Sequence, residues 1–259
     1  MVAPHDGSNN RRPAHPPPEM AASMMCADFL HLEDELDLLE SGGVHFLHMD
    51  IMDGHYVPNL ALSPDFCRRV GAASTLPQDV HLMVEDVDRF VPMFTALEPQ
   101  YLSFHPETSR HAVRTIQAIR SAGVTPGIAL DPAVTVASVA PLLQEVGLVC
   151  VMSVSPGYSG QQLIPWTLDK LSDLAARRDA HDLDFKIEVD GNASWENIPG
   201  MVAAGADVIV GGTSSIFDST MPRERALARA RRLLERTAPQ DDGAHSAAPR
   251  HNADAERTE

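Results

Sequence analysis

Residues 29–54 read FLHLEDELDLLESGGVHFLHMDIMDG, a segment in which a helical pattern passes into a strand pattern across two glycines. Large apolar side chains recur with the spacing that places them on one face of a helix: Phe29, Leu32, Leu36 and Leu39. The glycine pair comes next, and glycine is the residue preferred where a helix ends. The β-rich run that follows predicts a strand, so the segment as a whole predicts one helix leading into one strand.

The same alternation continues along the chain. Short β-rich runs recur at intervals of about 20 to 35 residues, at 22–25, 44–50, 79–83, 101–105, 124–130, 148–153, 185–190 and 207–211. The segments between them have helical patterns, and two of these end in Ala-Gly directly before a strand. Eight such units predict an α/β fold, a single (β/α)8 TIM barrel. The alternative is an open doubly wound sheet, but its GxGxxG fingerprint is absent after the first strand.

Both ends of the chain differ from this central part. Residues 1–20 are rich in Pro, Asn and His, and residues 237–259 are polar and rich in Ala and Pro. Segments of this kind bury too little apolar surface to offset the entropy lost on ordering. The sequence therefore predicts two disordered tails, 1–20 and 237–259, on either side of one barrel domain at 21–236.

Composition excludes several classes of partner. The 259 residues include 20 Lys and Arg against 36 Asp and Glu, a formal net charge of −16, which disfavours binding to nucleic acid. No apolar run reaches the roughly 18 residues of a membrane span. The three cysteines are widely spaced, and the N-terminal residues lack the apolar region of a secretory signal. We therefore expect a cytoplasmic protein with no membrane partner.

Four residues at the expected carboxyl ends of strands could bind a cation. His48 and Asp50 alternate on one face of the second strand, His81 lies in the third, and Asp190 ends the seventh. Chemistry in a barrel is located at these strand ends. Two imidazoles and two carboxylates suit a divalent ion such as Zn²⁺, Mn²⁺, Fe²⁺ or Co²⁺. The alternative is that each His is a satisfied core residue and each Asp caps a loop.

Small residues follow the last three strands and predict a phosphate site. The sixth strand leads into SVSPGYSGQ at 153–161, the seventh into Asp190-Gly191-Asn192, and the eighth into VGGTSS at 210–215. Backbone N–H groups in such turns can bind an anion, and barrels frequently bind phosphate after strands seven and eight. Any one of these turns alone is more often a tight turn without a ligand, but their placement after the late strands favours phosphate. The candidate contacts are Gly157, Tyr158, Ser159, Gly160, Gly191, Asn192, Gly212 and Thr213.

Three methionines also lie at strand ends: Met52, Met83 and Met152. Methionine usually fills gaps in a core. Two of these residues share a strand face with the candidate ligands. The alternative to a core role is therefore that their side chains form an apolar lining that excludes water from a reacting carbon of the substrate.

The run His48-x-Asp50-x-Met52-Asp-Gly-His-Tyr-Val-Pro-Asn59 resembles the signature of the ribulose-phosphate 3-epimerase family. The segments SMMCADF at 23–29, HLMV at 81–84 and VDG at 189–191 are similar to the same family, and the likeness extends over about residues 22–236. It implies a small-molecule sugar phosphate as substrate and a homo-oligomer. It also implies one divalent metal ion per subunit, of Zn, Mn, Fe, Co or Mg.

The resemblance implies a role for each matching residue. The metal ligands would be His48, Asp50, His81 and Asp190, and the two aspartates would form the acid/base pair. Ser23 and His81 would contact the substrate, and the turns after the last three strands would hold its phosphate end.

Within the family, the chain is most similar to the D-allulose-6-phosphate 3-epimerases, through residues 25–26, 59–64, 105–108, 164–171 and 212–214. Pentose-specific members usually read Asp-Gly-Gly where this chain reads Asp190-Gly191-Asn192, and often Gly-Gly where it reads Ser159-Gly160. The resemblance thus implies interconversion of D-allulose 6-phosphate and D-fructose 6-phosphate. The alternative is the same reaction on D-ribulose 5-phosphate, giving D-xylulose 5-phosphate. Another phosphosugar barrel chemistry, or a non-catalytic phosphosugar-binding barrel, is less favoured.

The expected reaction explains why two carboxylates are needed. To invert a carbon next to a ketone, a proton must leave from one face and return to the other, through an enediolate. A divalent cation would act as a Lewis acid for this intermediate. Carboxylates on opposite sides could exchange the roles of base and acid. The second and seventh strands lie roughly across the mouth of an eight-stranded barrel, so Asp50 and Asp190 could flank a flat intermediate.

Overall fold

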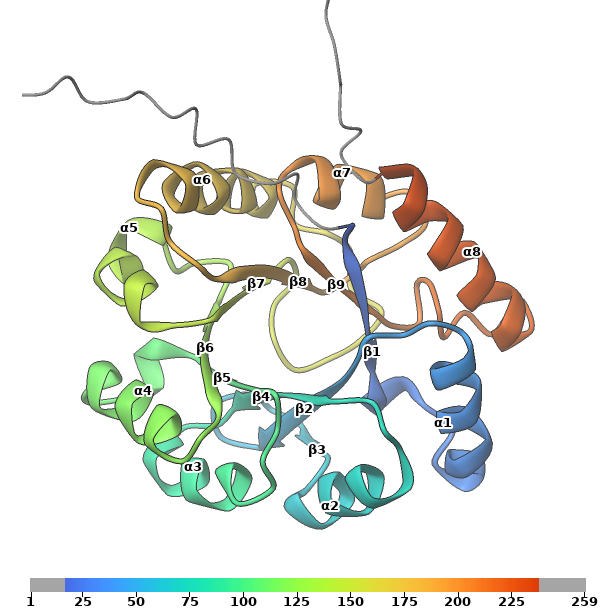
Figure 1. The fold of residues 1–259 in the computed structure, drawn as a ribbon, viewed down its shortest axis with the longest axis horizontal. Helices are drawn as coiled ribbons and strands as arrows, with labels where there is room; N and C mark the ends of the chain where they lie inside the picture. The colour runs from blue at the N-terminus through green and yellow to red at the C-terminus, as the bar shows by residue number, and fades with distance from the viewer. Residues whose placement is uncertain (1–16, 238–259) are drawn as a thin grey trace, which may run out of the picture. The chain divides into compact units, whose positions relative to one another are not determined.

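Eight parallel strands pair side by side until the last meets the first in the computed structural model, which describes residues 17–237 (Figure 1). In chain order the ring contains β1 Glu19–Ser23, β2 Phe46–Asp53, β4 Gln78–Met83, β5 Tyr101–Phe104, β6 Thr125–Leu130, β7 Leu148–Met152, β8 Lys186–Asp190 and β9 Val208–Gly211. Strand β1 pairs with both β9 and β2, which closes the sheet. The expected (β/α)8 barrel is confirmed, and the open sheet is excluded.

Helices lie around the outside of this ring (Figure 1). The α-helices are α1 Leu32–Ser41, α2 Pro64–Ala73, α3 Val87–Thr95, α4 Ala112–Ser121, α5 Val136–Val139, α6 Thr167–Ala180, α7 Ile198–Ala203 and α8 Arg223–Thr237. Short 3₁₀ turns are η1 Met24–Cys26, η2 Phe29–His31, η3 Pro106–Thr108 and η4 Ala140–Glu145. No helix within residues 17–237 is long and apolar enough to cross a membrane.

Alternation along β2 shows how the barrel interior is built. Leu47, Met49 and Ile51 belong to the main apolar core between strands and helices. The intervening side chains point into the barrel and align with those of β4, so that His48 lies opposite Asp79 and Asp50 opposite His81. A separate apolar cluster inside the ring contains Ala21, Phe46, Tyr101, Leu148, Val208 and Val210. The interior is therefore a packed core that carries polar groups toward the carboxyl ends of its strands.

The ends of the barrel domain differ from the expected boundaries. Strand β1 spans Glu19–Ser23. It begins three residues before the expected start at 22, and its residue Met20 is buried. These first residues were expected to belong to the disordered tail, because the Pro-rich segment before them masks a short apolar strand. At the other end, α8 extends to Thr237. The remainder of the two expected tails, 1–16 and 238–259, lies outside the described residues.

The segment that opened the sequence analysis is also more varied than expected. Its helix begins with the turn η2, where the Asp28 side chain accepts a hydrogen bond from the backbone N–H of Leu30, and continues as α1. Phe29 is 51% exposed and packs on Phe66 with ring centroids 5.2 Å apart, so it does not join the buried stripe. An unexpected short strand, β3 Leu60–Ala61, pairs antiparallel with the end of β2.

Candidate metal centre and active site

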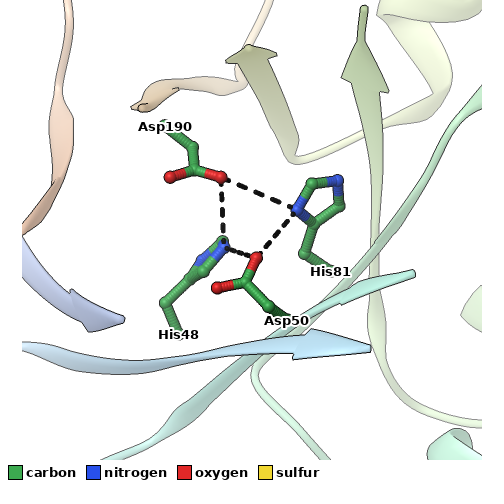
Figure 2. Close-up of side chains that lie close together, drawn as sticks. All are labelled: His48, Asp50, His81 and Asp190. Carbon is green, nitrogen blue, oxygen red and sulfur yellow. Dashed lines mark ion pairs between the residues drawn. The ribbon is translucent and has the colours of Figure 1, made fainter. Parts of the chain in front are cut away.

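Four side chains from three strands meet inside the barrel (Figure 2). His48 and Asp50 come from β2, His81 from β4 and Asp190 from β8. His48 Nε2 lies 3.4 Å from Asp50 Oδ1 and 3.9 Å from Asp190 Oδ2. His81 Nδ1 lies 3.5 Å from Asp50 Oδ1 and 3.9 Å from Asp190 Oδ2. The four ligand atoms thus face one common centre, within 4.8 Å of one another.

These distances fit a bound cation better than direct hydrogen bonds. His48 Nε2 and His81 Nδ1 are both fully buried and have no hydrogen-bond partner among the described residues. An unpaired buried polar atom is costly, so these nitrogens favour a ligand between them. The four nitrogen–oxygen distances of 3.4 to 3.9 Å are longer than normal hydrogen bonds and would leave room for an ion between the groups. The donor set therefore fits a divalent metal ion.

A second acidic pair lies behind His48. The Nδ1 atom of His48, which faces away from the candidate ligands, is 2.6 Å from Asp79 Oδ2 and 3.7 Å from Glu188 Oε1. Both carboxyl groups are about 1% exposed, and burial together with Asp79 raises the pKa of Glu188 well above its usual range. An acceptor at Nδ1 holds the His48 proton there and leaves Nε2 free to bind a metal. Asp79 thus favours the tautomer that the metal centre needs.

The two candidate acid/base groups have unlike environments. Asp50 Oδ2 accepts a hydrogen bond from Ser23 Oγ at 3.0 Å. Burial opposes ionisation of Asp50, but the adjacent imidazoles of His48 and His81 outweigh it and lower its pKa below the usual range. Burial and the Asp50 carboxylate raise the pKa of Asp190 to about 6. One site therefore contains two carboxyl groups of different basicity.

A cleft opens above the four candidate ligands. Asp50 and Asp190 line it, whereas both histidines are fully buried below and are not among its lining residues. His81, which was expected to contact the substrate, thus lies behind the carboxylates and does not line the cleft. The other expected residues that line the cleft are Ser23, Met52, Met83, Met152, Gly157, Tyr158, Ser159, Gly160, Gly191, Asn192, Gly212 and Thr213. None of the described lining residues is Lys or Arg.

The loop after β7 is held over the cleft by the segment that follows β2. Tyr158 OH donates to the backbone carbonyl of Pro58 at 2.5 Å, and Asn59 Nδ2 donates to that of Gly157 at 2.8 Å. Gly157 has φ +117°, and a Cβ there would come within 3.1 Å of Val57. The run from Val57 to Asn59 therefore supports the loop after β7, whose residues Gly157 and Tyr158 line the cleft.

Asn192 joins the three loops expected to bind phosphate. Its Nδ2 donates to Ser214 Oγ at 3.1 Å, and its Oδ1 accepts from the Leu163 backbone N–H at 3.1 Å. Asn197 Nδ2 donates to the same oxygen at 2.8 Å. The residue has φ +41°, a left-handed conformation that asparagine tolerates better than most residues. Its side chain therefore stabilises the loops after β7, β8 and β9.

Several residues of the site had no role assigned to them from the sequence. Asp79 and Glu188 lie beside His48, His105 lies beside His81, and Met25 and Cys26 also line the cleft. Two of these had a signal in the sequence, because Asp79 and Glu188 each lie two positions before a ligand and so share its strand face. His105 follows directly after β5, which is the position in a barrel where functional residues occur.

Comparisons with known proteins agree with this geometry. Residues 19–217 match the model of the family described as the ribulose-phosphate 3 epimerase family. A "Ribulose-phosphate 3-epimerase" of Helicobacter pylori strain J99 is 42% identical over 210 residues, covering 81% of this chain and 94% of the relative. The protein of the same name from Escherichia coli K12 is 40% identical over 200 residues, covering 77% of this chain and 88% of the relative.

Solved structures with little sequence similarity share the fold. N-(5'-phosphoribosyl)anthranilate isomerase from Pyrococcus furiosus aligns with a TM-score of 0.58 at 12% identity, covering 85% of this chain and 99% of that one. Thiamine phosphate pyrophosphorylase from the same organism aligns with a TM-score of 0.57 at 12% identity, covering 85% and 96%. At this level of identity the likeness supports the barrel alone.

Proposed function

The chain belongs to the ribulose-phosphate 3-epimerase family, and from this membership we propose that it interconverts D-ribulose 5-phosphate and D-xylulose 5-phosphate. Membership of the family itself indicates a ketose-phosphate 3-epimerase. The names of relatives about 40% identical favour the five-carbon substrate over the D-allulose 6-phosphate expected from the sequence.

The pairing of Asp50 and Asp190 is the observation that carries the proposal. Both carboxylates line one cleft, and they come from β2 and β8, which are three steps apart in the ring of strands. A flat enediolate between them would present one face to each. We assign removal of the C3 proton to one carboxylate and its return on the opposite face to the other. The Ser23 hydroxyl orients Asp50 for this step by its hydrogen bond to Oδ2.

His48 and His81 would hold one divalent metal ion together with the two aspartates. When bound, the ion would supply Lewis-acid stabilisation of the negative charge that develops on the substrate oxygens. Two imidazole donors favour Zn²⁺, Mn²⁺, Fe²⁺ or Co²⁺ over Mg²⁺. Met52, Met83 and Met152 are at most 5% exposed in the wall of the cleft, where they would exclude water from the reacting carbon.

The turns after β7, β8 and β9 would hold the phosphate group at the other end of the cleft. Since the described lining residues include no Lys or Arg, the charge would be met by backbone N–H groups and small hydroxyls. Thr213 and Ser214 follow β9 at the place where barrels often bind phosphate.

The environment of Asn192 removes one argument for a six-carbon substrate. The sequence departs from Asp-Gly-Gly at this position, but both polar atoms of the Asn192 side chain bind neighbouring loops. The substitution thus has a structural use that is independent of the length of the sugar.

A direct comparison of substrates tests the proposal. Purified protein with its metal content measured on the same sample should be given D-ribulose 5-phosphate and D-allulose 6-phosphate separately. We expect a higher kcat/KM with the five-carbon phosphate. A higher kcat/KM with D-allulose 6-phosphate would instead support the six-carbon substrate, and no turnover of either would contradict both readings.

A further inference from the structure

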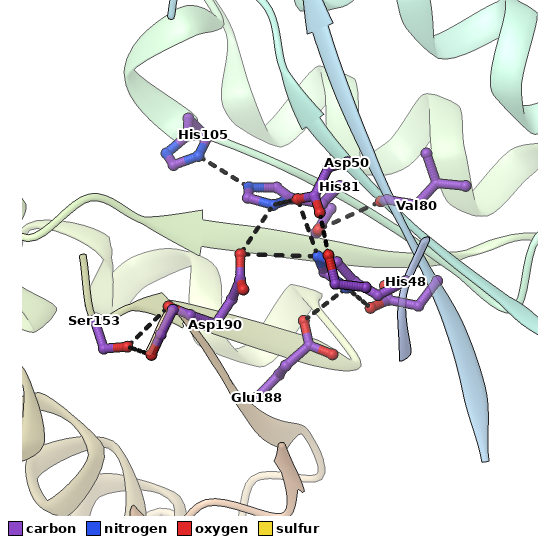
Figure 3. A network of polar contacts seen from close by, with 12 residues as sticks. His48, Asp50, Val80, His81, His105, Ser153, Glu188 and Asp190 are labelled. Carbon is purple, nitrogen blue, oxygen red and sulfur yellow. Dashed lines mark hydrogen bonds and ion pairs between the residues drawn. The ribbon is translucent and has the colours of Figure 1, made fainter. Parts of the chain in front are cut away.

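His81 has a second buried imidazole behind it. Its Nδ1 faces the cluster of ligands, and its Nε2 lies 3.0 Å from Nε2 of His105 (Figure 3). His105 follows directly after β5 and is 0% exposed. It is not among the residues that line the cleft, so it does not contact a bound sugar phosphate there. Its effect on the site must pass through His81.

The contact between the two rings allows only one arrangement of protons once His81 binds a metal. A ligand nitrogen carries no proton, so a neutral His81 that binds through Nδ1 has its proton on Nε2. A hydrogen bond across 3.0 Å needs one donor and one acceptor. His105 Nε2 must therefore accept, and the proton of His105 lies on its Nδ1.

A carboxylate that attracts the proton on His105 Nδ1 lies on the side of His105 that faces away from His81. Its Nδ1 is 3.5 Å from Glu107 Oε1, longer than a full hydrogen bond, and has no closer hydrogen-bond partner among the described residues. Tyr56 OH donates to the same oxygen at 2.9 Å. The Tyr56 ring also packs on His105 with centroids 4.7 Å apart, and His105 on His81 with centroids 5.1 Å apart. Each ring is thus held by both a polar contact and a packing contact.

We propose that His105, Glu107 and Tyr56 form a positioning chain that keeps His81 in the tautomer and orientation with Nδ1 free to bind the metal ion. The chain is the counterpart of Asp79 at His48, but it leaves the opposite ring nitrogen free. It extends from the buried His81 to Glu107, whose side chain is 36% exposed. This inference rests on the proposed function, because it requires a metal ion at the four ligands.

The affinity for Zn²⁺, measured by competition with a chromogenic chelator on the metal-depleted full-length protein, tests the chain. His105→Phe keeps a ring but removes the acceptor, and we expect it to weaken Zn²⁺ binding by about 10- to 100-fold. Glu107→Gln and Tyr56→Phe should give smaller losses in the same direction. The matched control is Glu145→Gln, since Glu145 is 34% exposed, lies in η4 and pairs with Arg120. It should bind Zn²⁺ as the wild type does.

Nitrogen-15 chemical shifts of the metal-loaded protein give a readout that a loss of stability would not produce. The wild type should show His81 protonated on Nε2 and His105 protonated on Nδ1. The opposite assignment of the two protons would overturn the proposed chain. Wild-type affinity for Zn²⁺ in both Glu107→Gln and a folded His105→Phe variant would overturn it as well. If the wild type itself binds no Zn²⁺, the proposed metal centre fails as well, so the two failures are distinguishable.

Discussion

Asp50 and Asp190 reach the same cleft, but different neighbours surround each carboxylate. Asp50 accepts the Ser23 hydroxyl and lies against two imidazoles, which lower its pKa. Asp190 is reached by both imidazoles only at 3.9 Å, and burial with the Asp50 charge raises its pKa to about 6. In a two-base epimerisation one carboxyl group starts ionised and the other starts protonated, and unlike environments favour such a division.

Replacing either aspartate by asparagine should remove most of the activity. Asp50→Asn and Asp190→Asn keep the size of the side chain but lose the basic oxygen, so we expect kcat to fall by about 10²- to 10⁴-fold. A coupled assay for D-xylulose 5-phosphate measures this. The control is Asp173→Asn, since Asp173 is 44% exposed on α6 and pairs with Arg177. An unchanged kcat in either active-site variant, folded by circular dichroism, would exclude that residue as base or acid.

Asn192 should affect substrate affinity without changing the choice of sugar. Asn192→Gly suits the φ of +41° but loses the hydrogen bonds to two neighbouring loops and to Asn197 in its own loop. We therefore expect KM for D-ribulose 5-phosphate to rise while the ratio of kcat/KM values for five- and six-carbon phosphates stays the same. Steady-state kinetics with both substrates measure this. A tenfold change in that ratio would mean that Asn192 contacts the sugar itself.

At the scale of elements, hydrophobic patterning predicted the order of strands and helices well. The eight parallel strands, including the fully buried β4 and β7, have β-rich sequences between helical ones. The meeting of the four candidate ligands could be predicted because a strand alternates its side chains, and because barrels place functional residues at strand ends.

Other elements gave weaker signals. Strand β3 has only two residues and pairs with the end of β2, and so short a pairing leaves no periodic pattern. The start of β1 follows a Pro-rich segment, which hid its first residues. The polar contacts behind the ligands, such as that between His81 and His105, depend on which strands become neighbours, and spacing along one strand does not give this information.

Helix α3 tests the packing of the outer layer. Phe94 is 0% exposed there, whereas its neighbour Met93 is 40% exposed. Phe94→Ala should lower the free energy of unfolding by about 3–5 kcal/mol through lost burial and a cavity. Met93→Ala should change it by no more than about 0.5 kcal/mol. Urea denaturation followed by circular dichroism compares the two, and equal midpoints would contradict the packing of α3 on the barrel.

At the scale of the whole molecule, the buried imidazoles and carboxylates inside the described barrel gather toward the carboxyl ends of the strands, and an apolar cluster fills the interior at the other end. Two of the ligand nitrogens have no partner among the described residues. This arrangement fits a metal ion that would occupy the centre.

Removal of the metal should therefore abolish activity reversibly. Dialysis against a chelator should leave the far-ultraviolet circular dichroism unchanged, because the barrel core does not depend on the ion, while turnover is lost. Addition of Zn²⁺, Mn²⁺, Fe²⁺ or Co²⁺ should restore it. Full turnover by protein that is metal-free by elemental analysis would show that the four ligands serve another purpose.

The most direct test of the account is the fate of the C3 proton. Purified, metal-loaded protein should be incubated with D-ribulose 5-phosphate in D₂O and followed by proton NMR. We predict that D-xylulose 5-phosphate forms with deuterium at C3 and at no other carbon, because two carboxylates exchange that proton with solvent. Formation of no epimer, or exchange confined to another carbon, would contradict the assignment of this site as a 3-epimerase.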